Sequence, residues 1–503
     1  MVEQHLCDSG GNPDDARAAA DAASLVPPDR LRSALVLSTL GTMLGAFYFP
    51  LAGGNTFNRF LELIDLNNRI GLFMGLPGLA AMTALLGSWL IQRTGYRRAF
   101  FFLLAGPPRL LWFAMITVPL WGPESRDGRT AILCLLGLAY WIANSVSSSA
   151  WFSWMRDIVP EHYRGRLFSY RNTLVTLVSA IWGLAAGYIL EKLGLDLFAF
   201  RTVYAIGVAF GIMDIIVYLF VYHPPMRMKD ETERGFVSMV KAAVHKDFLK
   251  FTGVQALWLF SCSMVALSMW HVQRGIGMEI YSIQVAGFFG TCVWLAFSLL
   301  WGRFIDHYGS KAAWSAALVS HAVSPVFYAL APYFGQNMVY LGICFGGIAM
   351  SGLTLANTTL LISLSSREDQ AMTMAARAFV SGMVVFVSFT ITESVLFPGL
   401  EKLGGRLGYC PLFKVTVVCT AAALLRAAVF AISLRLPEVE DKPPAGIIVK
   451  MFLTTNPLRA LYSFGRFLAV KTSETVGNSG YSRLHPSARW QPPAISDADD
   501  TPE

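Results

Sequence analysis

Twelve long apolar stretches constrain the fold of this chain more than any other feature of its sequence. Each is close to the roughly 20 residues that a helix needs to cross a bilayer. Only 15% of the 503 residues are charged, whereas soluble domains carry about 25%. We therefore predict an all-α integral membrane protein with twelve transmembrane helices. The predicted spans are residues 33–53, 70–92, 98–121, 130–153, 168–190, 199–222, 248–272, 282–301, 312–332, 336–362, 372–397 and 411–434.

The distribution of basic residues predicts how these spans are oriented. An even number of spans places both tails on the same side of the membrane. Most of the 40 lysines and arginines fall in the tails and in the connections after spans 2, 4, 6, 8 and 10. Because basic loops are retained in the cytoplasm, we predict cytoplasmic termini. This bias also explains the net charge of +7, so we expect no nucleic-acid partner.

The longest polar connection divides the spans into two groups of six. LEKLG occurs at Leu190–Gly194 and again at Leu400–Gly404, each time after the fifth span of a group. Such self-similarity indicates an internal duplication, so we predict two pseudo-symmetric six-helix bundles. The expected parts are a disordered tail (1–30), a first bundle (31–222), a cytoplasmic linker (223–247), a second bundle (248–436) and a tail (437–503). Residues 446–471 of that tail mix apolar and basic side chains, which is typical of a segment lying on anionic lipid.

The connection after span 8 carries a motif. It reads GRFIDHYGSK, from Gly302 to Lys311, and resembles the G-x-L-x-D-R-x-G-R-K pattern of the major facilitator superfamily. Phe304 and His307 deviate from that pattern. Glycine permits a tight turn, and the acid can accept hydrogen bonds from a helix N-terminus or an arginine. The matching residues are Gly302, Asp306, Gly309 and Lys311.

The connection after span 2 repeats this pattern in weaker form. It reads GSWLIQRTGYRR, with Arg93 and Gly95 in place and Gln92 instead of the acid. Gly309 follows Gly95 by 214 positions, which is close to the spacing of the duplicated pentapeptide. The resemblance to the superfamily covers about residues 31–436.

A cluster of charges lies between spans 4 and 5. The segment from Asp157 to Arg171 resembles a loop found in many bacterial members of the superfamily, and Arg377 follows Arg171 by 206 positions in the second half. The resemblance implies that such charges hold a cytoplasmic gate; the alternative is that they only fix the orientation of the spans. The candidate gate residues are Arg93, Gly95, Asp157, Arg164, Arg166, Arg171, Gly302, Asp306, Gly309 and Arg377.

The resemblance also implies a central cavity lined by spans 1, 4, 7 and 10, with substrate bound near the midplane. Polar and aromatic side chains on these spans are the candidates, because such groups are costly against lipid. For a single serine or threonine, helix packing is the competing interpretation. The candidate cavity residues are Tyr140, Trp141, Asn144, Ser148, Gln255, Trp258, Ser261, Asn357 and Thr358.

Few ionisable residues occur inside the predicted spans. If a proton or another cation drives transport, Glu393 in span 11 and His321 in span 9 are the candidate coupling residues. Asp214 and Arg426 lie 212 positions apart, in spans 6 and 12. Those spans usually face lipid in this superfamily, so the sequence assigns Asp214 and Arg426 no role.

These observations predict a secondary or facilitated transporter that moves a small solute across a bacterial inner membrane by alternating access. The alternative is a non-transporting membrane factor of the same fold, which handles assembly or pigment. The sequence contains no metal-ligand cluster, nucleophile elbow or Gly-rich phosphate loop, so we expect neither an enzyme nor a cofactor. The expected partners are the solute, a coupling ion and membrane lipid, with the protein as a monomer.

Overall fold

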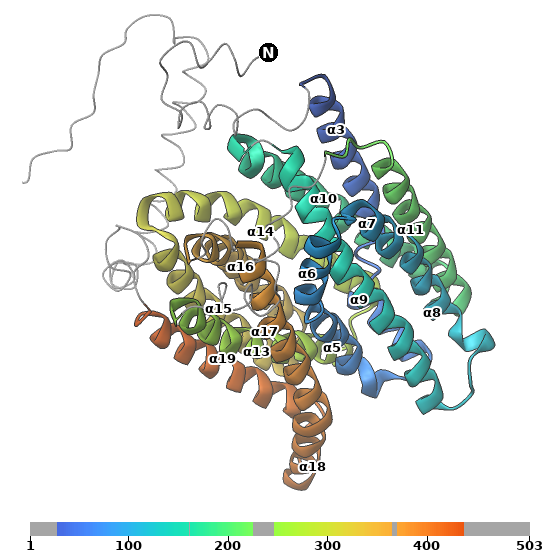
Figure 1. The fold of residues 1–503 in the computed structure, drawn as a ribbon. Helices are drawn as coiled ribbons and strands as arrows, with labels where there is room; N and C mark the ends of the chain where they lie inside the picture. The colour runs from blue at the N-terminus through green and yellow to red at the C-terminus, as the bar shows by residue number, and fades with distance from the viewer. Residues whose placement is uncertain (1–27, 160, 225–245, 365–369, 437–503) are drawn as a thin grey trace, which may run out of the picture. The chain divides into compact units, whose positions relative to one another are not determined.

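The structure is a computed structural model that describes residues 28–159, 161–224, 246–364 and 370–436. The regular elements of these residues are helices (Figure 1). Residues 1–27 of the first predicted tail, the whole second tail and most of the predicted linker lie outside the described residues, while residues 28–30 of the first tail belong to the first helix. The first half comprises α3 (Pro28–Gly45), α4 (Gly54–Leu63), η1 (Asn67–Arg69), α5 (Ile70–Ala81), α6 (Ala84–Thr94), α7 (Arg97–Ala105), η2 (Pro107–Arg109), α8 (Leu110–Trp121), α9 (Arg126–Ile158), α10 (Glu161–Lys192) and α11 (Leu197–Tyr218). The second half comprises α13 (Lys246–Gly275), α14 (Ile280–Tyr308), α15 (Ser310–Phe334), α16 (Gln336–Leu364), α17 (Gln370–Ile391), η4 (Thr392–Leu396), α18 (Phe397–Leu407) and α19 (Phe413–Ser433).

Eleven segments of the described chain are long and apolar enough to cross a membrane, and they coincide with predicted spans 2 to 12. The all-helical membrane fold is therefore confirmed. The predicted first span, 33–53, corresponds to α3, which begins earlier, at Pro28, and ends at Gly45. The chain then runs in turns as far as Gly53. Gly53 has a φ of 93°, a conformation that favours glycine. The last part of the predicted span therefore lies outside a helix.

Three of the spans contain breaks in their helical geometry. Span 3 changes from α7 to α8 at Gly106, Pro107 and Pro108, because proline lacks the N–H that would continue the α-helix. Span 2 is likewise divided into α5 and α6. Span 11 contains the π-helical segment η4 and continues through α18 to Leu407, ten residues beyond its predicted end. Single π-turns of this kind often lie at functional positions.

The halves meet mainly where α17 packs on α5 and α6 and where α10 packs on α14. In Figure 1, α17 (orange-brown) runs beside α5 and α6 (blue). Two glycines bring α5 and α17 close together, because a Cβ atom on Gly78 would lie 2.7 Å from the carbonyl oxygen of Gly382. Close packing of small residues is a common way to join helices in lipid.

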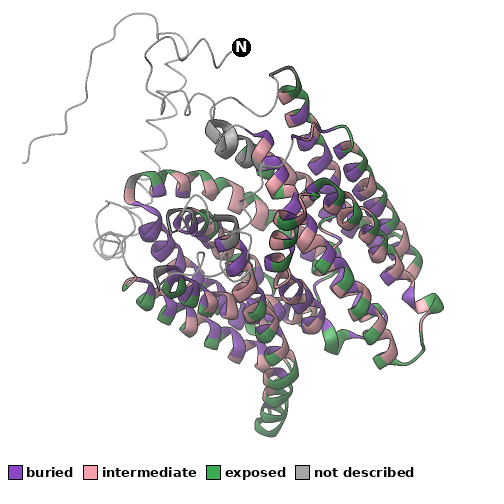
Figure 2. Ribbon diagram, viewed as in Figure 1, coloured by how far each residue is buried: buried purple, intermediate pink, exposed green. Residues whose placement is uncertain are grey.

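Burial follows the pattern expected for a protein surrounded by lipid. Figure 2 shows buried residues on the faces that helices turn toward one another and exposed residues on the opposite faces. Large apolar side chains are among the most exposed, including Leu299 (72%), Phe220 (71%) and Leu103 (67%). An apolar surface of this kind suits hydrocarbon rather than water.

One contact recurs at equivalent positions in the two halves. Arg97 donates from Nη2 to the carbonyl oxygen of Pro224 over 2.8 Å, and Lys311 donates from Nζ to the carbonyl oxygen of Leu436 over 2.5 Å. Lys311 follows Arg97 by 214 positions, and Leu436 follows Pro224 by 212. In each half a basic residue at the start of the third span thus binds the backbone just after the sixth, which supports the predicted duplication.

Candidate functional site

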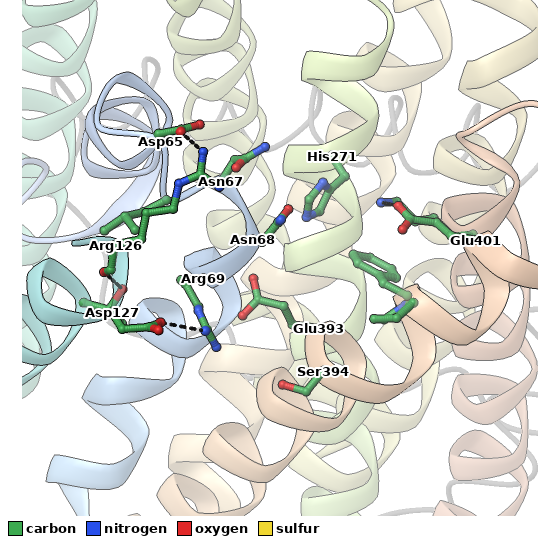
Figure 3. A pocket seen from close by; sticks show the side chains of 15 residues that line it. Asp65, Asn67, Asn68, Arg69, Arg126, Asp127, His271, Glu393, Ser394 and Glu401 are labelled. Carbon is green, nitrogen blue, oxygen red and sulfur yellow. Dashed lines mark hydrogen bonds and ion pairs between the residues drawn. The ribbon is translucent and has the colours of Figure 1, made fainter. Parts of the chain in front are cut away.

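A pocket of about 450 Å³ lies where the ends of the two halves meet (Figure 3). It opens at the end of the bundles that carries the connections 46–69, 122–125 and 408–412, which the charge pattern places outside the cell; we call this the predicted outer end. The first half contributes residues 65–69, which include η1, and the start of α9, and the second half contributes the end of α13, η4, α18 and the start of α19. Of the predicted site residues, Glu393 lines this pocket.

Charged side chains of both signs line the pocket, and most are paired within one half. Arg126 pairs with Asp65, and Arg69 pairs with Asp127 over 3.4 Å, both in the first half (Figure 3). Lys414 pairs with Glu401 in the second half. These ion pairs are partly or largely exposed, so each contributes little to stability. They give the pocket a polar rim that water can enter.

Glu393 differs from these residues because its carboxylate joins the two halves. Its Oε1 accepts the backbone N–H of Gly71 over 2.6 Å, and its Oε2 accepts that of Leu72 over 3.0 Å. Both N–H groups belong to the first turn of α5, where a helix has unsatisfied donors and favours negative charge. A Cβ atom on Gly71 would lie 3.0 Å from the Cβ atom of Glu393, so glycine permits the approach.

Hydrogen bonds between three further pairs of residues join the halves at the predicted outer end. Arg274 at the end of α13 donates from Nε to Glu62 Oε2 over 3.1 Å. The amide of Gln284 donates to Thr56 Oγ1, also over 3.1 Å. The backbone N–H of Tyr281 donates to Glu191 Oε1 over 2.7 Å. Together with Glu393, these contacts join the two halves around the pocket.

Three of the predicted residues meet inside the second half. The amide of Gln255 on α13 donates from Nε2 to Asn357 Oδ1 on α16 over 2.8 Å. Arg377 on α17 donates from Nε to Gln255 Oε1 over 3.0 Å. Gln255 and Asn357 are buried, and Arg377 is half-buried. The structure thus places Arg377, predicted as a gate residue, with two predicted cavity residues.

The first half contains an equivalent group. Arg171 on α10 donates from Nε to Thr42 Oγ1 on α3 over 2.9 Å, and its guanidinium lies 4.1 Å from the ring centroid of Trp151 on α9. Gln255 follows Thr42 by 213 positions, and Asn357 and Arg377 follow Trp151 and Arg171 by 206 each. The two groups therefore occupy matching places in the repeat, on spans 1, 4 and 5 and on spans 7, 10 and 11.

His321 and two more predicted cavity residues surround a buried arginine in the second half. The Trp258 indole donates to His321 Nδ1 over 2.9 Å. Arg426 donates to the carbonyl oxygen of His321 over 2.7 Å and to Ser261 Oγ over 3.1 Å. These four residues are buried. Arg426 therefore faces the interior of its bundle rather than lipid.

The other predicted cavity residues lie in less polar surroundings. Tyr140 is buried in an aromatic cluster against Tyr48, Trp112 and Trp141. The further candidates on α9 and α16 are partly or fully exposed: Asn144, Ser148 and Thr358. The hydroxyl of Thr358 donates to the carbonyl oxygen one turn earlier, as membrane threonines commonly do. Contact of these residues with a solute stays a prediction.

Among the predicted gate residues, Asp157 forms an ion pair with the fully buried Arg97, which also donates to His223 Nε2 over 3.4 Å. Burial and the neighbouring Arg97 and Arg98 lower the pKa of His223 below its ordinary value.

The other predicted gate residues lie at or near helix ends. The side chain of Arg93 is exposed, and its guanidinium lies 5.3 Å from the ring centroid of Trp89. The gate residues at helix ends are Gly95 and Gly309, both with positive φ, and Gly302 and Asp306 on the last turns of α14. The side chains of Arg164 and Arg166 lie outside the described residues.

Sequence reasoning missed the buried ion pair of the first half. Asp214 on α11 accepts from Arg109 Nη2 over 2.7 Å, and both side chains are buried. Arg109 also lies 5.0 Å from the ring centroid of Tyr48. Gly41 and Gly45 on α3 leave room for Asp214, since a Cβ atom on Gly45 would lie 2.7 Å from its Oδ2. This pair of glycines one turn apart is the signal from which an inward-facing Asp214 could have been predicted.

The comparisons with known proteins agree with this geometry. A family model described as the Major Facilitator Superfamily matches residues 65–389. No curated protein matches the chain.

Several solved membrane transporters are similar to the chain. A D-xylose–proton symporter shares 14% identity with a TM-score of 0.61, over 82% of this chain and 99% of that chain. The nucleoside transporter NupG shares 12% identity with a TM-score of 0.57, over 80% and 98%. A bacterial homolog of the human lysosomal transporter Spinster shares 16% identity with a TM-score of 0.55, over 85% and 98%. At these identities the likeness establishes the fold.

Proposed function

The chain belongs to the major facilitator superfamily, and from that premise we propose that it moves a small solute by alternating access of its two halves. It is a multi-pass membrane transporter and not an enzyme. The contact that carries the proposal is the one between Glu393 and the first turn of α5. A carboxylate of one half that caps a helix of the other half is a bond that opening must break.

The bonds across the predicted outer end suggest a state in which the solute site opens toward the cytoplasm. In the opposite state, Glu393 separates from Gly71 and Leu72, and the cytoplasmic ends of the halves approach one another. We assign the cytoplasmic closure to the predicted gate residues. Asp157, paired with Arg97, holds the first half of that gate, and Asp306 at the end of α14 holds the second.

Glu393 is also the better candidate for proton coupling. An ionised carboxylate accepts with both oxygens, whereas a protonated one loses its charge and one of its acceptors. Protonation would therefore weaken both bonds to α5 and favour opening at the predicted outer end. His321 accepts from Trp258 within one half, so its protonation would not act directly on the contact between the halves.

The remaining expectations complete this proposal. The charge pattern favours cytoplasmic termini and a place in a bacterial inner membrane, with the protein as a monomer. The solute would bind between the halves, near the polar groups built around Gln255 and Asn357 on one side and Asn144 and Ser148 on the other. The family match favours transport over the alternative of a non-transporting membrane factor.

Solvent access to the pocket tests the proposal without knowledge of the solute. A single cysteine replaces Leu66, which lines the pocket and is buried in this state, in a background whose seven natural cysteines are changed to serine. Its rate of reaction with a membrane-impermeant maleimide reports opening. We expect Glu393→Gln to raise that rate about tenfold, because charged hydrogen bonds contribute about 1.5–3 kcal/mol each. Glu124→Gln, at an exposed position outside the pocket, is the matched control. An unchanged rate in Glu393→Gln would refute the role of Glu393 as the outer latch.

A further inference from the structure

His271, near the end of α13, carries a buried polar atom that the proposed mechanism does not use. Its Nε2 is buried and has no hydrogen-bond partner within the described part of the chain. Most buried polar atoms in proteins are hydrogen-bonded, so an unpaired one needs an explanation. A neutral imidazole binds a proton near neutral pH and then donates hydrogen bonds from both nitrogens. Such a group is suited to a partner that arrives in another state of the protein.

His271 lies beside the turn that carries Glu393. Both side chains line the pocket at the predicted outer end, and Figure 3 shows the imidazole on the side of the pocket that carries Glu393. The imidazole is almost perpendicular to the ring of Phe397, with the ring centroids 5.0 Å apart. Phe397 follows Glu393 by about one turn, where η4 passes into α18. Because His271 and Glu393 both belong to the second half, they stay together when the first half moves away.

The charges of the pocket identify Glu393 as the carboxylate that His271 would serve. Four carboxylates and three cations line the pocket. Three of the carboxylates are in ion pairs with the three cations: Asp65 with Arg126, Asp127 with Arg69, and Glu401 with Lys414. Glu393 is bound instead by the N–H groups of α5, although the field of Arg69 also reaches it. One proton on His271 therefore brings the charge of the pocket to zero.

The other charged groups around His271 are already paired. Lys414 and Glu401 act on an imidazolium with opposite signs, and they are bound to each other. Arg274, in the next turn of α13, is bound to Glu62 of the first half. Within the described residues, Glu393 is thus the carboxylate of this region that opening releases without another ion-pair partner.

Opening of the outer end removes the bonds that hold Glu393 in this structure. The two N–H groups that it accepts belong to α5 and move away with the first half. Losing charge-assisted hydrogen bonds without replacement is costly, and the cost is greater where water is partly excluded. An imidazolium at His271 would replace the lost donors from within the same half.

We propose that His271 binds one proton when the outer end opens, and that the resulting imidazolium takes over the carboxylate of Glu393 from α5. This inference rests on the proposed transport function and adds a regulation of the same pocket by external pH. The proton comes from water at the predicted outer end and binds the neutral imidazole. Closing reverses the exchange: Glu393 returns to the N–H groups of α5, and His271 releases the proton. Since opening takes up a proton, a lower external pH favours it.

The pH dependence of opening in the full-length protein tests the proposal. Spin labels on cysteines that replace Glu124 and Gly405, which are exposed and lie in different halves, report the outer distance by electron paramagnetic resonance in lipid nanodiscs. For the wild type, we expect the population with the longer distance to grow from pH 8 to pH 5. Uptake of one proton limits the change in the ratio of the two populations to about tenfold per pH unit. We expect His271→Gln to lose this dependence and to keep the wild-type distribution of pH 8.

A permanent charge at the same position gives a gain of opening rather than a loss. His271→Lys is a cation over the whole pH range, so we expect it to show at pH 8 the longer distance that the wild type shows at pH 5. This effect requires Glu393, and the double variant with Glu393→Gln should open no further than Glu393→Gln alone. Gly399→Lys adds the same charge at an exposed position of α18 outside the pocket, and it is expected to keep the wild-type pH profile.

Three results would overturn the proposal: a wild-type profile that does not change with pH, a His271→Gln profile equal to that of the wild type, or a folded His271→Lys that stays closed at pH 8. The second of these would assign the titration to Glu393 itself. If His271→Lys fails to fold, the profile of His271→Gln decides. A protein that opens in Glu393→Gln but ignores every change at His271 would refute this inference alone, whereas an outer end that never opens would refute the transport proposal.

Discussion

The backbone N–H of Gly71 lies 2.6 Å from Oε1 of Glu393, although the two residues are 322 positions apart in the chain. Gly71 belongs to the first half and Glu393 to the second. The contact occurs where α17 changes into the π-helical segment η4, which lengthens the turn that carries the carboxylate. A break in the regular geometry of a long helix thus lies at the contact between the halves, as expected for an element that changes when the transporter opens.

The close approach of Gly78 and Gly382 is expected to hold α5 against α17. Gly382→Ala places a methyl group against the backbone of α5, so we predict weaker association of the halves and a lower unfolding temperature. Overpacking of this kind typically costs about 1–3 kcal/mol. Thermal unfolding in detergent measures the effect. Gly399→Ala is the control, because a Cβ atom there has no neighbour within 4 Å; equal melting temperatures for the two variants would argue against a tight contact.

The ion pair between Arg109 and Asp214 is predicted to be essential for the stability of the first half. Asp214→Asn leaves the buried guanidinium of Arg109 without its counter-charge, and breaking a buried pair costs about 3–5 kcal/mol. We expect the double variant Arg109→Gln with Asp214→Asn to recover part of that loss, because neither side chain of this pair is then charged. A double-mutant cycle of unfolding free energies checks this, and purely additive effects would show that the residues do not interact.

Gln255 is predicted to organise the polar group of the second half. Gln255→Leu removes the acceptor of Arg377 and the donor to Asn357, leaving two groups without partners at about 1–3 kcal/mol each. We expect a clear loss of thermal stability. Thr354→Val, at an exposed position on the same helix as Asn357, serves as the comparison. If both variants melt at the same temperature, the hydrogen bonds of Gln255 contribute nothing.

The stability of the cytoplasmic end is predicted to depend on pH through His223. Burial and the charges of Arg97 and Arg98 lower the pKa of His223 from 6.5, so the folded protein keeps its imidazole neutral. Above pH 6.5 the residue is neutral in both states and its full contribution to stability is present. As the pH falls below 6.5, the unfolded chain binds a proton that the folded chain does not, and the free energy of unfolding decreases.

His223→Gln should remove that part of the pH dependence. The measurement is the unfolding temperature of both proteins between pH 5 and pH 8. We expect the two curves to run in parallel above pH 6.5 and the wild-type curve to fall more steeply below it. Curves that remain parallel over the whole range would show that His223 does not contribute to the acid sensitivity.

Much of the fold could be predicted from the sequence because the physical signal is strong and local. Long apolar stretches separated by charged connections predict membrane helices, and eleven of the predicted spans agree with the structure. The first span was placed too late, because α3 begins with the polar residues around Pro28 and ends before the apolar run through Pro50 does. The extension of span 11 through α18 was also missed, since charged residues and glycines interrupt the apolar run after Phe397.

The site could be predicted only in part, because partners distant in the sequence decide what a polar side chain does. Gln255 and Asn357 were both selected as polar residues in spans, but nothing in the sequence indicates that they bind each other. Asp214 and Arg426 received no role, because the expectation that their spans face lipid outweighed the rule that buried charges find partners. Glu393 was selected for its charge, whereas its bond to α5 depends on how the halves pack.

Distances between pairs of spin labels, measured by electron paramagnetic resonance in lipid nanodiscs, test the central claim most directly. One pair would span the halves at the predicted outer end and the other at the cytoplasmic end. We predict two populations in which a short outer distance accompanies a long cytoplasmic one and the reverse, with Glu393→Gln favouring the state with the longer outer distance. A single distance at each end, unchanged by Glu393→Gln and by pH, would contradict the alternation of the two halves.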